Sequence, residues 1–285
     1  MTGAARIMIH MKLLSLALLS VALLSSAHAA ERETQTPAEK LVTARRVLII
    51  AHRGDSKAAP ENTLPAFRSA LRAGADLVEL DYYHSSDGVP VVFHDKELDR
   101  TTDAVRRWGG RKIPLTSKSL AELRTLDAGR WFNPKFAGTK IPTLTRSIEV
   151  IQAGSVTLIE RKGGNAKTCV ALLAKHRWTE QLVVQAFDWD YLADCHRLAP
   201  KLVLGALGSK KITPAKLDQI EKCGASVVGW NYKDLRKSDI VEIHRRGLRV
   251  WVYTVDDPKV AQRLIESGVD GLITNVPGKM KKLVP

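Results

Sequence analysis

From residue 46 onward, short apolar runs rich in β-branched residues alternate with longer segments whose apolar positions have helical spacing. Most of the short runs are continuously apolar rather than alternating, which is typical of strands buried on both faces of a sheet. The predicted strands are Val47–Ala51, Leu77–Tyr82, Val89–Phe93, Thr157–Glu160, Leu182–Phe187, Leu202–Ala206, Val227–Trp230, Val250–Thr254 and Gly271–Thr274.

The longer segments carry the start and stop signals of helices. Some begin with Pro directly after Thr or Asp, as at Thr213-Pro214 and Asp257-Pro258, and several end at Gly, as at Gly224 and Gly268. Strands that alternate with helices indicate βα units and a parallel sheet. The predicted helices are Leu64–Ala73, Ala166–His176, Tyr191–Leu198, Pro214–Lys222, Ser238–Arg246 and Pro258–Ser267.

The number of strands fits an α/β fold of the TIM (β/α)8 barrel type, provided that the run over 89–93 is an extra hairpin strand beside the second one. The rhythm breaks over about 95–142, which contains Gly109-Gly110 and Asn133-Pro134 and is interpreted as a small insertion after the second strand. No linker-like segment divides residues 46–276, so one domain is favoured over two. An open doubly wound sheet is the alternative, but its Gly-x-Gly-x-x-Gly signature is absent.

The amino-terminal residues have the order of a secretory signal peptide. Arg6 and Lys12 precede an apolar run over 13–24, and Ala27-His28-Ala29 follows as a small-residue cleavage site. The run is shorter than the ~20 residues that span a bilayer, although an uncleaved anchor is the alternative. We expect a signal peptide over 1–29, a polar linker over 30–45 and the barrel over 46–285, in a periplasmic or secreted protein without a stable membrane span.

The chain is basic, with 44 Lys and Arg against 30 Asp and Glu, a net charge of +14. This charge favours anionic partners such as phosphates, nucleic acid or acidic lipid surfaces. The basic residues are scattered and no nucleic-acid recognition motif accompanies them, so a nucleic-acid partner is not expected. The three cysteines, Cys169, Cys195 and Cys223, lack metal-site spacing and are interpreted as buried thiols, with a Cys169–Cys195 disulfide as the alternative.

Acidic residues are placed to meet inside the predicted barrel. Glu79 and Asp81 are two positions apart on one strand, so both point to the same face, and Glu160 at the end of the next barrel strand adds a third carboxylate. Three interior carboxylates suit a hard divalent ion such as Mg²⁺ or Ca²⁺. The alternative is an internal salt bridge with Arg53 or Lys162.

Other polar residues follow the carboxyl ends of the strands, where barrel enzymes have their active sites. Arg53 and Lys162 are candidates to clamp a phosphate, the first by its planar fork and the second as a point charge. Gln185 and Trp251 lie on further strands and are expected to contact substrate.

His52 and His94 each follow a predicted strand and are candidates for an acid–base pair, because histidine titrates near neutral pH. A single histidine at a strand end is more often structural, but two beside a predicted metal site and a cationic clamp favour catalysis. Motifs of other chemistries, such as Gly-x-Ser-x-Gly, His-Glu-x-x-His and Cys-x-x-Cys, are absent.

These motifs resemble the glycerophosphodiester phosphodiesterase family. The resemblance spans residues 47–277 in order. The matching stretches are Ala51-His52-Arg53-Gly54, Pro60-Glu61-Asn62-Thr63, Gly74-Ala75-Asp76 leading to Glu79-Leu80-Asp81, Asp87 to Asp95 ending in Phe93-His94-Asp95, Arg100-Thr101-Thr102, Glu160-Arg161-Lys162, Gln185-Ala186-Phe187-Asp188 and Asp270 to Pro277.

The resemblance implies a barrel enzyme that hydrolyses glycerophosphodiesters to sn-glycerol 3-phosphate and an alcohol such as choline or ethanolamine. It implies that Glu79, Asp81 and Glu160 hold the divalent metal and that Glu61 and Asn62 support the site structurally. By the same pattern His52 and His94 act as acid and base, and Arg53 and Lys162 bind the phosphate. The family's insertion after the second strand matches the irregular segment.

The sequence departs from the family pattern at three positions. Asn275 stands where Asp is common, Ala186 where Ser is common, and Tyr82 where a small aliphatic residue is usual. None of these removes a predicted ligand, and Tyr82 alternates away from Asp81, which places it outside the barrel.

Two other functions compete with this interpretation. The first is a lysophospholipase D that acts on lysolipids, for which Trp108, Trp131 and Phe132 of the insertion would line an acyl groove; these residues could equally cap a small core. The second is a non-catalytic exported binding protein, which would be expected to lack a histidine or a metal acid. Neither the oligomeric state nor the choice between Mg²⁺ and Ca²⁺ follows from the sequence.

Overall fold

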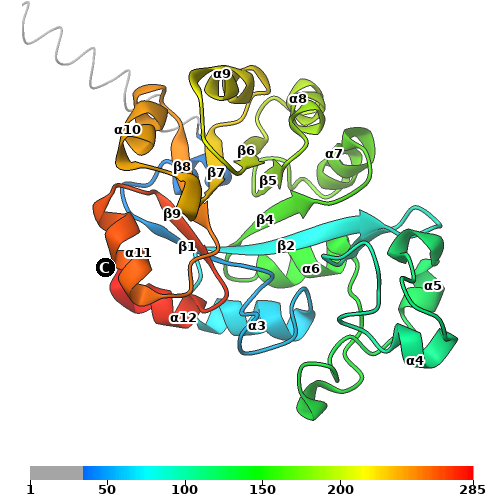
Figure 1. Cartoon of the computed structure of the whole chain (residues 1–285). Coiled ribbons are helices and arrows are strands. Elements are labelled where there is room, and N and C mark those ends of the chain that lie inside the picture. The colour runs from blue at the N-terminus through cyan, green and yellow to red at the C-terminus, as the bar shows by residue number, and fades with distance from the viewer. Residues whose placement is uncertain (1–34, 285) are drawn as a thin grey trace, which may run out of the picture.

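The computed structural model describes residues 35–284, in which eight parallel strands close into a barrel surrounded by helices (Figure 1). A ninth strand, β3, pairs antiparallel with β2 outside the barrel, and β1 closes the ring by pairing with both β2 and β9. The predicted TIM barrel is confirmed. The strands are β1 (Leu48–Ala51), β2 (Leu77–His84), β3 (Pro90–Val92), β4 (Val156–Arg161), β5 (Val183–Ala186), β6 (Val203–Gly208), β7 (Val227–Asn231), β8 (Arg249–Tyr253) and β9 (Gly271–Thr274).

The helices cover the outside of the barrel, and each predicted helix is present to within two residues at either end. The caps behave as the sequence indicates, since the Asp257 side chain accepts hydrogen bonds from the backbone N–H groups of Lys259 and Val260. The covering helices are α3 (Leu64–Arg72), α6 (Leu144–Ile151), α7 (Ala166–Lys175), α8 (Trp189–Leu198), α9 (Pro214–Lys222), α10 (Lys237–Arg245), α11 (Pro258–Glu266) and α12 (Pro277–Met280).

The insertion lies beside the carboxyl-terminal half of β2 and extends away from the barrel (Figure 1). Its own small core is built from apolar side chains that include Leu98, Leu115 and Leu126. It contains α4 (Ala104–Trp108), α5 (Leu120–Leu123) and the short 3-10 turns Leu115–Ser117 and Pro134–Phe136.

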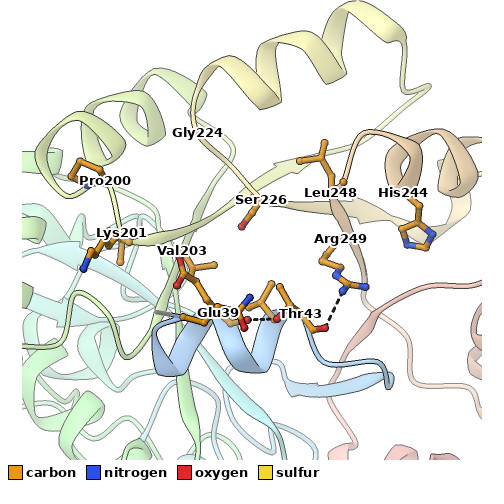
Figure 2. Close-up of a pocket in the computed structure, with 14 residues that line it drawn as sticks. Glu39, Thr43, Pro200, Lys201, Val203, Gly224, Ser226, His244, Leu248 and Arg249 are labelled. Atoms are coloured by element: carbon orange, nitrogen blue, oxygen red, sulfur yellow. Dashed lines mark hydrogen bonds between the residues drawn. The ribbon is translucent and has the colours of Figure 1, made fainter. Parts of the chain in front are cut away.

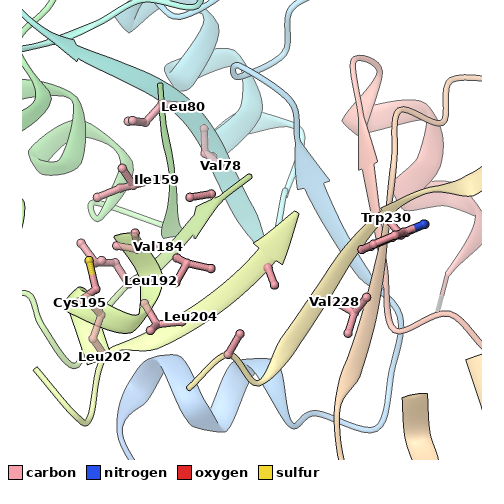
Figure 3. Close-up of a cluster of buried hydrophobic side chains, with 14 of the residues drawn as sticks. Val78, Leu80, Ile159, Val184, Leu192, Cys195, Leu202, Leu204, Val228 and Trp230 are labelled. Carbon is pink, nitrogen blue, oxygen red and sulfur yellow. The ribbon is translucent and has the colours of Figure 1, made fainter. Parts of the chain in front are cut away.

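The main core lies between the strands and the surrounding helices, where outward-facing residues of the barrel, such as Val78 and Val184, meet apolar helix residues such as Leu192 (Figure 3). Tyr82 packs in this outer layer, and its hydroxyl lies 2.9 Å from that of Tyr191 on α8, as its alternation from Asp81 predicts. All three cysteines are free and buried.

A second core fills the amino-terminal half of the barrel interior. Its floor is closed by α2 (Pro37–Val42), whose Ala38 and Val42 pack against the inward-facing residues. The segment predicted as a polar linker over 30–45 is therefore helical in part, because two apolar positions four residues apart face the open end of the barrel. The barrel residues of this core are Leu48, Ile50, Leu77, Leu158, Val183, Val203, Val227, Trp251 and Ile273.

Within residues 35–284, no helix is both long enough and apolar enough to cross a bilayer. The predicted signal peptide over 1–29 lies outside the described residues and stays a prediction.

Candidate active site

Three buried carboxylates meet above the apolar floor of the barrel. Asp81 on β2 is in register with Glu160 on β4, and Glu79 lies two residues before Asp81 on the same face. One oxygen of each carboxylate lies within 4.8 Å of an oxygen of the other two. The period-two spacing thus brings together the three residues that the sequence singled out.

Two cations lie against this triad. The Arg53 Nε atom is 3.4 Å from Asp81 Oδ2, and Lys162 Nζ is 3.3 Å from Asp81 Oδ1 and also contacts Glu160. The backbone N–H of Arg53 donates to Glu79 Oε2 at 2.6 Å, while Glu79 Oε1 is buried with no hydrogen-bond partner. The internal salt bridges are therefore real, but two cations face three carboxylates, and Glu79 Oε1 is left with neither a hydrogen bond nor an ion pair.

The electrostatics of the triad show the same deficit of positive charge. Burial, followed by the charges of Asp81 and Glu160, raises the pKa of Glu79 well above its ordinary value. Burial and Asp81 raise the pKa of Glu160 to about 7. Burial opposes ionisation of Asp81 as well, but Lys162 and Arg53 outweigh it and its pKa is lowered. A cation among these oxygens would relieve the repulsion, so the site fits a divalent metal.

Asn62 holds Asp81 from the loop after β1. Its side-chain nitrogen donates to Asp81 Oδ2 at 2.8 Å, and its oxygen accepts from the Asp81 backbone N–H at 3.1 Å. Asn62 has a φ of 57°, a left-handed conformation that Asn tolerates better than most residues. It therefore has the supporting position that the motif implied.

His52 lies on one side of the site against an amide. Its Nδ1 atom is 2.7 Å from Asn275 Oδ1, and the Asn275 side-chain nitrogen donates to Asp256 Oδ2 at 2.8 Å. Because Asp256 fixes the amide, Asn275 presents its oxygen to the ring and His52 carries a proton on Nδ1. Burial, followed by the charge of Arg53, lowers the pKa of His52 to about 4.

His94 lies against a carboxylate instead. Its Nδ1 atom is 2.6 Å from Asp95 Oδ1, and Arg100 Nε donates to Asp95 Oδ2 at 2.6 Å. Arg100 also makes two hydrogen bonds to Glu61, which accepts a third from Arg53 Nη1 at 2.9 Å. Glu61 therefore links the hydrogen-bonded pair Asp95–Arg100 beside His94 to Arg53.

A cavity of about 170 Å³ lies at the carboxyl end of the barrel, and both histidines, both cations and Glu160 line it. Its outer wall is aromatic, with Phe187 53% exposed and packed edge-to-face against Tyr253 at a ring-centroid distance of 6.2 Å. The lining residues are His52, Arg53, His94, Glu160, Lys162, Gln185, Phe187, Leu207, Tyr253, Thr254 and Ile273.

Trp251 does not line this cavity, although the sequence placed it among the substrate contacts. It is fully buried in the lower barrel core, where its indole ring occupies space left by Gly271, and a Cβ there would lie 2.6 Å from the ring. Tyr253, two residues later on the same face of β8, reaches the cavity instead.

Comparison with known proteins shows the family to which the chain belongs. The sequence model of the glycerophosphoryl diester phosphodiesterase family matches residues 52–279. The chain belongs to this family. The family and the enzyme class that the motifs indicated are confirmed.

Relatives within the phosphodiesterase family align over most of the chain. A glycerophosphodiester phosphodiesterase of Bacillus subtilis (strain 168) is 33% identical over 266 residues, which is 85% of this chain and 88% of the relative. One from Caldanaerobacter subterraneus is 33% identical over 247 residues, 84% of this chain and 98% of the relative. An Oleispira antarctica phosphodiesterase, solved in complex with the product sn-glycerol-3-phosphate, superposes with a TM-score of 0.77 at 30% identity, covering 85% of this chain and 98% of its own.

Several residues of the candidate site were not assigned a role from the sequence. Asp95 and Arg100 stand in motifs of the family, and an acid directly after a candidate catalytic histidine was a usable signal. Asp256 supports His52 through Asn275, but it lies in a loop far along the chain and carried no signal. Phe187 and Tyr253 lie at or just after strand ends, and their place in the cavity lining can be predicted only when the register of the strands is known.

A much larger cavity, about 990 Å³, lies at the opposite end of the barrel (Figure 2). It lies between α2 and the loops that enter β6, β7 and β8, and Arg249 donates there to the backbone oxygen of Thr43 at 2.9 Å. None of the metal-ligand candidates or the two histidines lines it. Its size therefore does not make it the catalytic site.

Gly54 is required by the loop that carries His52 and Arg53. Its φ is +80°, and a Cβ there would lie 2.7 Å from the backbone carbon of Ala66. We expect Gly54→Ala to lower the free energy of unfolding by about 3 kcal/mol or more, because strain and a backbone clash add. The matched control is Gly74→Ala, where φ is +71° but nothing lies within 4 Å of the new Cβ, with an expected loss of about 1 kcal/mol. Urea unfolding of both variants measures the difference, and equal losses would contradict the clash.

Proposed function

We propose that this protein hydrolyses glycerophosphodiesters to sn-glycerol 3-phosphate and an alcohol, with a divalent metal and two histidines. The observation that carries the proposal is a cluster of three buried carboxylates of which Glu160 lines one small cavity together with two cations and two histidines, in a chain of the glycerophosphoryl diester phosphodiesterase family. The product complex of the Oleispira antarctica relative supports the same substrate class.

Glu79, Asp81 and Glu160 would hold the metal, Mg²⁺ or Ca²⁺, because they offer oxygen ligands and each has a buried oxygen without a hydrogen-bond partner. When bound, the metal supplies positive charge for the phosphate and its developing negative charge. Arg53 and Lys162 line the cavity beside the triad and hold the phosphate from the protein side. Arg53 is suited to bidentate contact, and the Gln185 amide adds a neutral donor.

His52 is the base in this proposal. With its Nδ1 proton donated to Asn275, the neutral ring presents the Nε2 lone pair, which can take a proton from water or from the neighbouring glycerol hydroxyl. Its lowered pKa keeps the ring neutral throughout the physiological pH range.

His94 is the acid. The Asp95 carboxylate lies 2.6 Å from His94 Nδ1 and orients the ring, and Arg100 holds that carboxylate in place from its other oxygen. The ring then presents an Nε2 proton to the oxygen of the leaving alcohol. His52 thus faces an amide and His94 a carboxylate. We assign the base role to His52 and the acid role to His94 on this difference.

The lysophospholipase D alternative receives less support. The cavity of about 170 Å³ is smaller than the ~300–1,000 Å³ of sites for drug-sized ligands. Trp108 packs onto the insertion core beneath Lys118, and Phe132 packs edge-to-face against Trp131 and Phe136 rather than lining an acyl groove. The alternative of a non-catalytic binding protein predicts the loss of a histidine or an acid from the site. Both histidines and all three acids are in place, so this alternative is not supported.

The test is an assay of the purified protein after treatment with a chelator. We expect sn-glycerol 3-phosphate to be released from glycerophosphocholine and glycerophosphoethanolamine when Mg²⁺ or Ca²⁺ is restored, and not before. Choline release from lysophosphatidylcholine alone would transfer the protein to the lysolipid-acting class. Inactivity on all three substrates with either metal would support the binding protein instead.

A further inference from the structure

A groove with an apolar floor and a basic rim lies on the flank of the barrel, away from the active site. It has a volume of about 520 Å³ and lies between α3, α6 and the base of the insertion. No acidic residue lines it, and it shares no lining residue with the active-site cavity. Its floor contains Leu64, Pro65, Ile141 and Pro142, and its rim contains Arg68, Arg124, Lys140 and Arg146.

The charges of this rim are largely uncompensated. Arg68 and Arg124 are exposed and form no ion pair with a described residue. The Lys140 ammonium donates to backbone oxygens, the nearer at 3.1 Å, and not to a carboxylate. Arg146 alone has an acidic partner, Glu149 at 2.8 Å. The groove therefore presents a local excess of positive charge to the solvent.

A loop over residues 129–138, here called the insertion tip, continues this surface. Asp127 closes the loop by accepting hydrogen bonds from the backbone N–H groups of Gly129 and Gly138, both at 2.9 Å. The chain leaves the tip directly into Thr139 and Lys140, which line the groove. The tip therefore adjoins the groove at these two residues.

The insertion tip exposes aromatic and basic side chains together. Trp131 is 40% exposed, one of the few large apolar residues on the described surface, and its indole N–H donates to the backbone oxygen of Ala128 at 2.9 Å. Phe132 buttresses it edge-to-face at 5.7 Å. Arg130 and Lys135 flank this pair and are exposed. The indole is thus held outward on a rigid support.

We propose that the insertion tip and the basic groove dock this enzyme onto bilayers that contain anionic phospholipids. Tryptophan is favoured at the boundary between headgroups and acyl chains, and Lys and Arg near a membrane are attracted to anionic lipids. Single-stranded nucleic acid is disfavoured because the aromatic rings of the tip meet edge-to-face, at interplanar angles of 85° and 65°, and form no stacking platform. Since the active-site cavity has a separate lining, docking uses no catalytic side chain.

The experiment is co-sedimentation of the whole protein with vesicles of phosphatidylcholine alone or of phosphatidylcholine mixed with phosphatidylglycerol. We expect binding to the mixed vesicles only, weakening as salt is raised. Arg68→Glu combined with Arg124→Glu should lower the apparent affinity at least ~10-fold, because each basic residue near the surface adds to the attraction. Trp131→Ala should lower it several-fold at every salt concentration, since its contribution is apolar.

The matched control reverses two exposed lysines, Lys222→Glu with Lys237→Glu, on α9 and α10 at the far side of the barrel (Figure 1). It makes the same change in net charge and should retain nearly all of the vesicle binding. An equal loss in the control would show that net charge alone drives adsorption and would overturn the proposal, as would a wild type that binds an oligonucleotide but no vesicle. If the charge-reversed groove variant is unfolded by circular dichroism, the milder Arg68→Gln with Arg124→Gln replaces it. Binding is read without turnover, so failure of docking and failure of the proposed hydrolysis remain distinguishable.

Discussion

His94→Ala is expected to slow the release of choline from glycerophosphocholine by roughly 10²–10⁴-fold, while hydrolysis of the p-nitrophenyl ester of glycerol phosphate stays within about tenfold of wild type. Choline is a poor leaving group that needs a proton on its oxygen, whereas p-nitrophenolate leaves without one. An acid that protonates the leaving oxygen therefore matters for the first substrate and hardly for the second. The measurement is kcat on the two substrates with the same metal.

His52→Ala provides the comparison, because a base that activates the nucleophile is needed whatever leaves. Its loss should reduce kcat for both substrates by a similar factor within the same ~10²–10⁴ range. His176→Ala, which removes a ring stacked on Trp178 at a helix end, is the histidine control and should leave kcat unchanged. If His94→Ala slowed both substrates alike, the acid role would not belong to His94; the reverse pattern in the two variants would exchange the roles.

Much of the barrel could be predicted because its strands are buried on both faces and its helices are capped. Continuous apolar runs such as Val227–Trp230 have few other interpretations, and Pro after Asp257 marks a helix start independently of the tertiary structure. The carboxylate triad was also predictable, since the period of two places Glu79 and Asp81 on the same face of the strand. A parallel register then brings Glu160 beside Asp81.

The remaining features depend on contacts between distant segments, which periodicity does not contain. The helix α2 is only six residues long, too short to be stable in isolation, and Ala38 and Val42 are buried only because they pack against the open end of the barrel. The depth at which a residue lies inside the barrel likewise cannot be predicted from periodicity. Trp251 and Tyr253 face the same way, but the indole lies in the apolar floor and only the phenol reaches the cavity.

The supporting partners of the two histidines show the same limit. Asp95 is adjacent to His94 in the sequence, so its contact is local and could be inferred. His52 and Asn275 are separated by 223 residues and meet only because β1 and β9 are neighbours when the barrel closes. The proposed division into acid and base depends on these partners and therefore could not be made from the sequence.

Glu79→Gln is expected to abolish metal-dependent turnover and, at the same time, to stabilise the metal-free protein. Loss of a direct ligand should reduce activity by more than ~100-fold, the upper range for outer-shell partners of metal sites. The amide retains an oxygen to accept from the Arg53 backbone N–H, and its new N–H₂ group can donate to the neighbouring carboxylates. The gain in free energy of unfolding without metal should be about 1 kcal/mol at neutral pH.

The sign of the stability change follows from the pKa of Glu79, which burial, Asp81 and Glu160 raise well above 4.5. A carboxyl group with a raised pKa binds its proton more tightly in the folded state, so the metal-free wild type loses stability as pH rises above about 4.5. The variant lacks this group and retains only the corresponding loss from Glu160, whose pKa is about 7. Urea unfolding in chelator between ~pH 5 and ~pH 8 should therefore give a shallower decline for the variant.

A matched control separates the loss of a ligand from the loss of any carboxylate near the site. Glu61→Gln makes the same chemical change at a residue that pairs with Arg53 and Arg100 and lies outside the triad. It should destabilise the protein, because Arg53 and Arg100 each lose one of their two carboxylate partners, yet Mg²⁺ or Ca²⁺ should still raise its melting temperature as in the wild type. For Glu79→Gln the melting temperature should rise without metal and respond little to metal.

A wild-type metal response in Glu79→Gln would remove Glu79 from the ligand set, and a lower stability in chelator would contradict the unrelieved repulsion in the triad. Opposite changes in metal-free stability, a gain for Glu79→Gln and a loss for Glu61→Gln, are expected only if the carboxylates of the triad repel one another when no metal is bound.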